Sequence, residues 1–591
     1  MSEPGSDHPR ALEDYEAPAS DEFAVSGRSA AGTVAAGIFT SRIVGFVRER
    51  AFAHFFGVGV HADVLQVAFR LPNLLQNLLG EGTISAAFIP IYSRMLAEGR
   101  EEDAGRFAGA IFGLLVVAAL VLSAFGFVFA EPIVAIFTPG FLQDAARVAA
   151  GTLPINRFEV AVQAVRIIFP MTGFLVLSAW CLGVLNSHRR FFLPYFAPVI
   201  WNMAIISALF VVGWVALDPD VSVWTLENVD LEARRRLLFA AFFGALLGGL
   251  LQFLVQLPLV LRVLKGFRVS ISMRVEGVKA ALRAFGPVVA GRGVYQLSGY
   301  LDTVLASFLA AGAVSSLRYA LMLYILPVSL FGLSVAASEL PELSRFSSEK
   351  IQAFMARLQR SMGQMLFMTV PTLIGYLVFG YLVVGAIFQT GEFGLSDQWL
   401  VYLVLAGYSL GLLATTMSRL LQNAFYALNN TKTPAKIAVL RVVVSSAAAI
   451  PLMLLLDQFS VSGVVNTWGA PLGLSVEPPE DRLLYLGSAG LALGTTLGAW
   501  VELWRLLRAL RSMVPVVTLP WDRIRRMIAT AAFACVPALV VWLVLPGWHV
   551  AAKAVLVLLM YVFVYFGASY LQNAPELEAW IGRFMRRGRN G

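Results

Sequence analysis

Residues 107–130 read FAGAIFGLLVVAALVLSAFGFVFA, a stretch without a single charged side chain. A helix of about 20 apolar residues is long enough to cross the hydrocarbon core of a bilayer. Similar stretches recur from residue 33 to residue 571, and only 14% of the 591 residues are charged. A typical soluble domain has about 25% charged residues. The sequence therefore predicts an all-α integral membrane protein and excludes a soluble enzyme, a disulfide scaffold and a largely disordered chain.

The apolar stretches outline fourteen candidate membrane spans, several of them longer than a bilayer requires, which a tilted helix can accommodate. They cover approximately residues 33–56, 64–92, 107–130, 160–185, 193–216, 237–262, 281–311, 316–341, 362–388, 398–426, 435–456, 484–508, 525–546 and 551–571. An even number of spans places both termini on the same side of the membrane.

The distribution of Lys and Arg predicts which side that is. The segments that share a side with the termini carry 22 Lys and Arg residues, whereas the opposite segments carry 6. Because cytoplasmic loops are enriched in these residues, both termini are predicted to be cytoplasmic. The run of three arginines at 234–236 is an exception to this pattern. The acidic segment 1–28 lacks the apolar core of a signal peptide and is predicted to be a disordered cytoplasmic tail.

Two halves of the chain resemble each other. GFVRERAFAHFFGVGV (45–60) and GYLDTVLASFLAAGAV (299–314) are each followed by a proline, 27 and 28 residues after the first glycine. The alternative is chance similarity between apolar segments. An internal repeat would give two six-helix lobes with the same orientation, a parallel repeat. The predicted boundaries are 29–262 and 263–510 for the lobes, 511–571 for two additional helices and 572–591 for a basic cytoplasmic tail.

Ionisable side chains inside the first two spans are the main functional candidates, because each costs about 2.5–3.5 kcal/mol at the bilayer centre. Arg42, Arg48 and Arg70 predict a cationic cavity for an anionic substrate. The alternative is that Arg48 extends its charge to the interface and Arg42 pairs internally. Asp63 could pair with Arg48 or Arg70 as a gate, or cap the second helix. Glu81 could pair with Arg42.

The second half of the chain carries further charges inside predicted spans. Arg318 lies near the start of the eighth span, Arg419 in the tenth and Arg441 in the eleventh. For lone arginines at this depth an internal ion pair is the simplest expectation. Asp302 lies in the middle of the seventh span, and our hypothesis is that Arg441 reaches it.

The sequence offers little for catalysis or cofactor binding. Cys181 and Cys535 lie in apolar stretches, where buried, inert thiols are expected. The five histidines show no metal-ligand spacing, and no phosphate-binding Walker loop is present. GYSLG (407–411) matches a nucleophile motif but lies in an apolar helix without a preceding strand. The net charge of +8 is scattered between apolar stretches, which argues against nucleic-acid binding. We therefore expect neither an enzyme, nor a metal site, nor a cofactor.

Several motifs resemble those of the MurJ/MviN family of lipid II flippases: SRIVGFVRER (41–50), FRLPNLL (69–75), EGTISAAFIPIYS (81–93) and FYALNNTKTPAK (425–436). The resemblance implies fourteen helices, a central cationic cavity and a groove for a prenyl tail formed by the last two spans. It also implies transport of lipid II, an undecaprenyl diphosphate carrying a disaccharide-peptide, across the bacterial inner membrane for cell-wall synthesis. The implied partners are this substrate and membrane lipids, and they could include other cell-wall synthesis proteins.

The resemblance also suggests individual site residues. Arg42, Arg48, Asp63 and Arg70 match cavity positions of the family, and Asn73, in the same motif as Arg70, is a further candidate substrate contact.

Two positions depart from the family pattern. Gln76 stands where the family commonly has Arg after PNLL, and Met322 stands where it commonly has Arg in a motif like YADRL. Arg318 or Arg292 could compensate for these losses. The alternative is a related flippase or exporter of another polyprenyl-linked glycan or amphipathic substrate.

Overall fold

The computed structural model describes residues 20–578, apart from 80, 218–221, 225, 227–228, 287–288, 290–299, 334–350, 470–474, 478–482 and 514–519. For residues 20–31, 71, 74–75, 77–79, 81, 216, 333 and 351 it describes the backbone alone. The described part is helical, with one isolated bridge between Ser460 and Tyr485 and no strand. This confirms the predicted all-α class.

The first half of the chain forms the helices up to α10. They are α1 (Ser20–Phe56), α2 (Val60–Leu79), α3 (Glu81–Ala87), α4 (Ile89–Ala97), α5 (Glu101–Val128), α6 (Ala130–Phe137), η1 (Pro139–Gln143), α7 (Asp144–Ala149), α8 (Arg157–Ser187), α9 (Phe192–Ala216) and α10 (Leu231–Val263). The first helix begins inside the segment predicted to be a tail.

The second half forms the remaining helices. They are α12 (Leu301–Ala306), α13 (Ala313–Pro327), the π-helical η2 (Val328–Leu333), α15 (Ile351–Phe388), α16 (Leu395–Ser409), α17 (Leu412–Ala427), α18 (Lys432–Leu456), α19 (Val461–Gly469), α20 (Gly487–Met513), α21 (Trp521–Val544) and α22 (Val550–Leu571).

Within the described residues, nine helices are long and apolar enough to cross a membrane. The bent pair α16 and α17, which meet at 41°, adds a tenth if it is one span. The charged helices α1, α2 and α20 are not among these candidates, and much of the predicted span 281–311 lies outside the described residues. The count of fourteen spans therefore stays a prediction.

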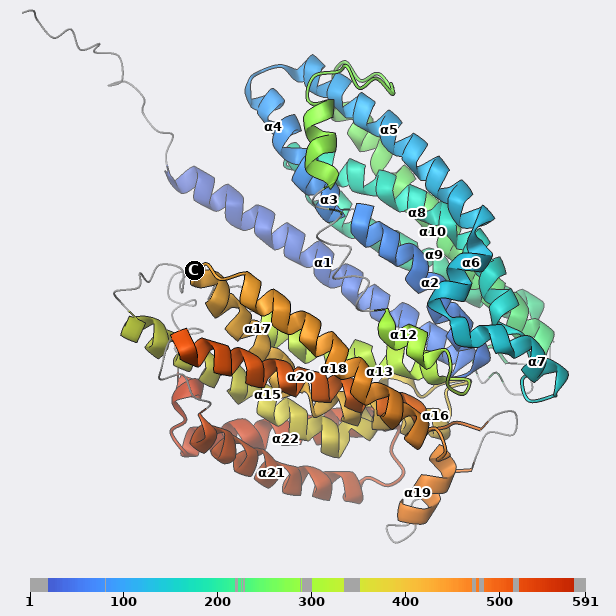
Figure 1. Ribbon diagram of the computed structural model, residues 1–591, viewed down its shortest axis with the longest axis vertical. Coiled ribbons are helices and arrows are strands. Elements are labelled where there is room, and N and C mark those ends of the chain that lie inside the picture. The colour runs from blue at the N-terminus through green and yellow to red at the C-terminus, as the bar shows by residue number, and fades with distance from the viewer. Residues whose placement is uncertain are drawn as a thin grey trace, which may run out of the picture.

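The helices form two groups with α1 running between them (Figure 1). The N-terminal group contains α2 to α10, and the C-terminal group contains α12 to α22. The groups meet at the end of the molecule that holds α7, α12 and α16, which we call the closed end, and they diverge toward α4 and α17 (Figure 1). The parallel repeat and the exact domain boundaries stay predictions.

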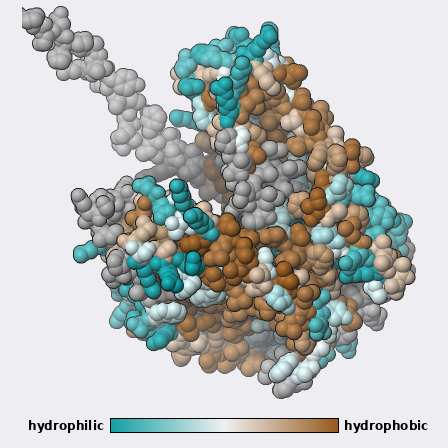
Figure 2. Space-filling model, in the orientation of Figure 1, coloured by the Kyte–Doolittle hydropathy of each residue, from teal (hydrophilic) through white to brown (hydrophobic). Residues whose placement is uncertain are grey.

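The outer surface of the bundle matches a lipid environment. Large apolar side chains are exposed on several helices: Trp214 of α9, Leu543 of α21, and Phe563 and Leu571 of α22. Brown, hydrophobic surface covers much of the face shown in Figure 2, while hydrophilic residues gather toward its margins. Exposed apolar surface of this extent requires contact with lipid or protein.

Close helix contact positions the cavity wall in the C-terminal group. Glycines 487, 490, 494 and 498 recur every three or four residues along α20, so they share one face. A Cβ atom at Gly494 would collide with Ala449 of α18. The absence of side chains lets α18 and α20 approach closely, and Glu502, one turn beyond Gly498, lies on the same face of α20.

Proline residues shape two helices differently. Pro72 lies inside α2, which continues through it and ends at Leu79. In α15, Pro371 has no N–H for the carbonyl of Phe367 four residues earlier. The hydroxyl of Tyr565 on α22 donates to that carbonyl at 2.9 Å. This hydrogen bond joins α22 to α15 within the C-terminal group.

Candidate functional site

A polar cavity of about 660 Å³ lies between the two helix groups, lined by α1 and α2 on one side and by α12, α13, α17, α18 and α20 on the other. Its lining contains five guanidinium groups and three carboxylates: Arg48, Arg70, Arg318, Arg419, Arg441, Glu49, Asp302 and Glu502. The excess of cations suits an anionic ligand.

Glu49 organises the α1 side of this cavity. Arg48 donates to Glu49 at 2.6 Å and to the side chain of Asn202 on α9 at 2.9 Å. The Arg48 guanidinium also lies 4.9 Å from the ring of Trp201. Arg318 of α13 approaches the same carboxylate at 3.8 Å. Glu49, whose side chain is 5% exposed, therefore holds one arginine from each side of the cavity, Arg48 of α1 and Arg318 of α13.

Arg70 lies opposite the start of α12. Its guanidinium is 4.8 Å from the ring of Tyr300, whose hydroxyl donates to the Arg70 carbonyl at 2.6 Å. Asn73, one turn further along α2, and Asp302 line the same cavity. The structure thus brings together Arg48, Arg70 and Asn73, three of the four predicted substrate contacts.

Arg441 of α18 does not pair with Asp302, as our hypothesis proposed. It donates to Glu502 of α20 at 2.7 Å, and Gln422 of α17 donates to the other oxygen of Glu502 at 2.9 Å. No ion pair joins Asp302 to Arg441 in the described part of the chain. The hypothesis is wrong because the glycine face of α20 brings a buried carboxylate, 1% exposed, closer to Arg441.

Arg419 behaves differently from the other cavity arginines. The sequence suggested an internal ion pair for it, but among the described residues it makes neither an ion pair nor a hydrogen bond. Its Nε atom is buried without a partner, and so is the hydroxyl of its neighbour Ser418. Both residues line the cavity.

The other predicted positions lie elsewhere. Arg42 is exposed on α1 and is not among the residues that line the cavity. Gln76 is half-buried outside the lining, and Met322 packs against the apolar core. The side chain of Glu81 and the whole of Arg292 lie outside the described residues.

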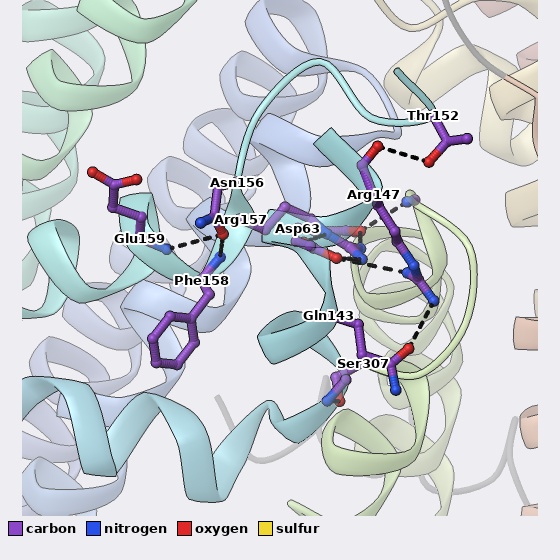
Figure 3. Close-up of polar contacts among 12 residues, drawn as sticks. Asp63, Gln143, Arg147, Thr152, Asn156, Arg157, Phe158, Glu159 and Ser307 are labelled. Carbon is purple, nitrogen blue, oxygen red and sulfur yellow. Dashed lines mark hydrogen bonds and ion pairs between the residues drawn. The ribbon is translucent and has the colours of Figure 1, made fainter. Parts of the chain in front are cut away.

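Asp63 joins the two helix groups at the closed end (Figure 3). It accepts hydrogen bonds from the backbone N–H of Gly312 at 2.8 Å and of Ser315 at 2.9 Å, so it caps the N-terminus of α13. Arg157, the first residue of α8, donates to Asp63 at 3.1 Å and to Asp144 at 2.6 Å. All three charged side chains are fully buried.

These contacts correct the predicted gate pairing. Asp63 pairs with Arg157 rather than with Arg48 or Arg70, because the start of α8 lies beside it and both cavity arginines are engaged further inside. The gate role of Asp63 stays a prediction.

A second set of polar contacts joins the groups at the same end. Arg50 donates to the carbonyls of Ala386 and Ile387 at the end of α15. Arg234 forms an ion pair with Glu392 at 3.1 Å. Arg234 is one of the three arginines at 234–236, which lie on the side of the membrane predicted to have few Lys and Arg residues. Its ion pair with Glu392 explains why an arginine is present there.

The described residues contain no group of three or more His, Cys, Asp or Glu side chains placed to hold a metal ion.

Comparison with known proteins identifies the family. A family described as "Lipid II flippase MurJ" matches residues 52–469 of this chain. The chain belongs to the MurJ family of lipid II flippases. This confirms the family expected from the motifs, and the family is one of transporters rather than enzymes.

Individual relatives support the same family assignment. A probable lipid II flippase MurJ of Haemophilus influenzae is 31% identical over 411 residues, which cover 68% of this chain and 76% of the relative. The lipid II flippase MurJ of Burkholderia cenocepacia is 32% identical over 412 residues, which cover 69% and 74% of the two chains. The protein is accordingly a multi-pass membrane protein.

Solved structures share the fold. A lipid II flippase MurJ in an inward closed conformation superposes with a TM-score of 0.65 at 21% identity, covering 91% of this chain and 98% of that chain. An inward-facing multidrug transporter of the MATE family gives 0.51 at 14% identity, covering 81% and 96%. At these identities the likeness concerns the fold alone.

Three partners in these ion pairs were not predicted from the sequence: Glu49, Arg157 and Glu502. Glu49 stands directly beside Arg48, and Glu502 continues the glycine face of α20. Those two signals could have indicated their roles. Nothing in the sequence around Arg157 indicates that it meets Asp63.

Proposed function

We propose that this protein moves lipid II from the cytoplasmic to the outer leaflet of the bacterial inner membrane by alternating access, for cell-wall synthesis. The observation that carries the proposal is an arginine-rich cavity between two helix groups in a member of the MurJ family. A diphosphate carries several oxyanions, and guanidinium groups bind these bidentately. Arg48, Arg70 and Asn73 are the proposed contacts within the cavity.

The geometry suggests how the cycle starts. With both termini in the cytoplasm, the closed end faces outward and the cavity is reached from the cytoplasmic side. Arg42 lies on α1 six residues before Arg48, about 9 Å along the helix axis. We assign it to the path by which the substrate headgroup enters. Glu49 would release Arg48 and Arg318 to the incoming phosphates.

Opening outward then requires the polar contacts of the closed end to separate. A ligand favours the outward-facing state only if it binds that state more tightly. Asp63, Arg318 and Glu81 are the proposed ion-pair or gate residues. Asp302 and Arg441 line the cavity wall. The prenyl tail would lie along α21 and α22, in contact with membrane lipids. Other cell-wall synthesis proteins would be the partners that supply and consume the substrate.

The test is replacement of the native lipid II flippase in a bacterium depleted of it. The unmodified gene should restore growth, whereas Arg48→Ala combined with Arg70→Ala should abolish rescue while the protein still reaches the membrane. Arg508→Ala, on an exposed face of α20, is the control and should rescue fully.

Full growth with the double cavity variant would contradict the proposal. A correctly inserted, unmodified protein that fails to restore growth would favour the second candidate, a flippase for another polyprenyl-linked glycan. That candidate rests on Gln76 and Met322, which place no cation where the family commonly has one.

A further inference from the structure

Arg419 is a cationic side chain whose charge nothing in the described part of the chain neutralises. It lies on α17 and lines the cavity, and its Nε atom is buried. Arg419 as a whole is half-buried, and a charged side chain within a membrane protein is costly unless it faces a cavity or a partner. Retaining such a group is therefore evidence for a function in the cavity.

The nearby carboxylate cannot satisfy Arg419. Glu502 already accepts from Gln422 through one oxygen and from Arg441 through the other. Glu502 therefore fixes Arg441 against the wall, and no carboxylate of the described residues forms an ion pair with Arg419. On the opposite wall Arg48 is compensated by Glu49 at 2.6 Å.

Neutral groups around Arg419 complete a set of donors. The hydroxyl of Ser418 is buried without a partner, and Ser445 and Ser446 of α18 line the same wall beside Arg441. Hydroxyl and guanidinium donors together match the acceptor oxygens of a phosphate or a carboxylate.

We propose that Arg419, Ser418 and Arg441 form a second oxyanion subsite on the α17–α18 wall, distinct from the α1–α2 wall that carries Arg48 and Arg70. The proposal rests on the proposed function and refines it: the substrate is held by two anionic groups at once, one on each helix group. Such a substrate would connect the two groups that move against each other.

Lipid II has two kinds of anionic group that could occupy the second subsite. One is the diphosphate itself, whose oxygens could reach both walls. The other is a carboxylate of the peptide that the disaccharide carries. The chemistry on the wall is the same for both, so the experiment must separate them.

The experiment measures binding to the full-length protein in proteoliposomes with two probes. One is lipid II, and the other is the same undecaprenyl diphosphate disaccharide without its peptide. Arg419→Gln is the test variant, Arg419→Lys retains the charge without the planar fork, and Arg505→Gln removes an exposed arginine of α20 as a matched control. Arg48→Gln reports on the α1–α2 wall.

Arg419→Gln should raise the Kd for lipid II at least tenfold, Arg419→Lys should raise it less, and Arg505→Gln should leave it unchanged. An equal loss with both probes assigns the subsite to a phosphate oxygen. A loss confined to the peptide-bearing probe assigns it to a peptide carboxylate. The thermal midpoint of Arg419→Gln should not fall, because the variant removes a charge that has no ion-pair partner among the described residues.

A Kd for lipid II that is unchanged in Arg419→Gln but raised in Arg48→Gln would overturn the subsite and leave the proposed function intact. A lowered thermal midpoint with unchanged binding would also overturn it, in favour of a structural role. If the unmodified protein binds neither probe, the proposed function itself fails.

Discussion

At the scale of single residues, burial and charge decide which contacts matter. Asp63 could be recognised in the sequence as costly inside a span, but its partner could not, because Arg157 comes from a helix that follows much later in the chain. The same holds for Glu502, whose role depends on how closely α20 approaches α18. Arg48 and Arg70 were predictable because they are charged residues inside two neighbouring spans, and Asn73 because it shares a motif with Arg70.

Asp63→Ala should strongly destabilise the protein. It would leave Arg157 buried with half of its ion pairs and uncap α13. Breaking a buried ion pair by removing one partner costs roughly 3–5 kcal/mol. Thermal unfolding in detergent would measure the loss.

Arg147→Gln is the control for this prediction. Arg147 lies 3.6 Å from Asp144, and its side chain is 32% exposed, so its loss should cost less than about 1 kcal/mol. Similar losses of unfolding free energy in the two variants would show that the buried ion pairs contribute no more to stability than the exposed one.

At the scale of helices, the sequence predicted some elements closely. The predicted spans 193–216 and 551–571 correspond to α9 (Phe192–Ala216) and α22 (Val550–Leu571). The span predicted at 64–92 instead covers most of α2, all of α3 and only the first turn of α4. Hydropathy detects apolar length and does not register where a helix is interrupted, so the second prediction was less accurate.

Gly494→Ala should separate α18 from α20, because the added methyl group would collide with Ala449. Overpacking of this kind typically costs about 1–3 kcal/mol. The shift should also weaken the contact between Arg441 and Glu502, so both the thermal midpoint and transport should fall.

The matched change Gly567→Ala in α22 meets no atom within 4 Å. Alanine favours a helix by about 1 kcal/mol over glycine, so this variant should be neutral or more stable. Equal effects at the two positions would mean that helix propensity, rather than the α18–α20 contact, explains the result.

At the scale of the whole molecule, the closed end is held by polar contacts between the groups. One buried apolar cluster also contains residues of both groups, so opening must separate apolar as well as polar contacts. The sequence could indicate two halves from its internal similarity, but not which charges meet between them, since those pairs link segments far apart in the chain.

Arg234→Glu should weaken the closed end, because it places like charges opposite each other at Glu392. The charge-swapped double variant, Arg234→Glu with Glu392→Arg, should restore closure. The readout is labelling of a cysteine at Val314, which lines the cavity, by a membrane-impermeant thiol reagent applied from outside.

Labelling should rise several-fold in the single variant and return toward the original value in the double variant. The native Cys181 and Cys535 are buried and should add little background. Labelling that stays equally high in the double variant would exclude the ion pair as a determinant of closure.

The buried Asp63 network also bears on how the protein is made. A ribosome synthesises the chain from the N-terminus, so Asp63, Asp144 and Arg157 enter the membrane before Gly312 and Ser315 exist. The carboxylate can therefore be neutralised by Arg157 within the first half alone. When α13 is inserted later, its two free N–H groups meet an acceptor that is already in place. The second half of the protein would thus assemble on a docking point prepared by the first.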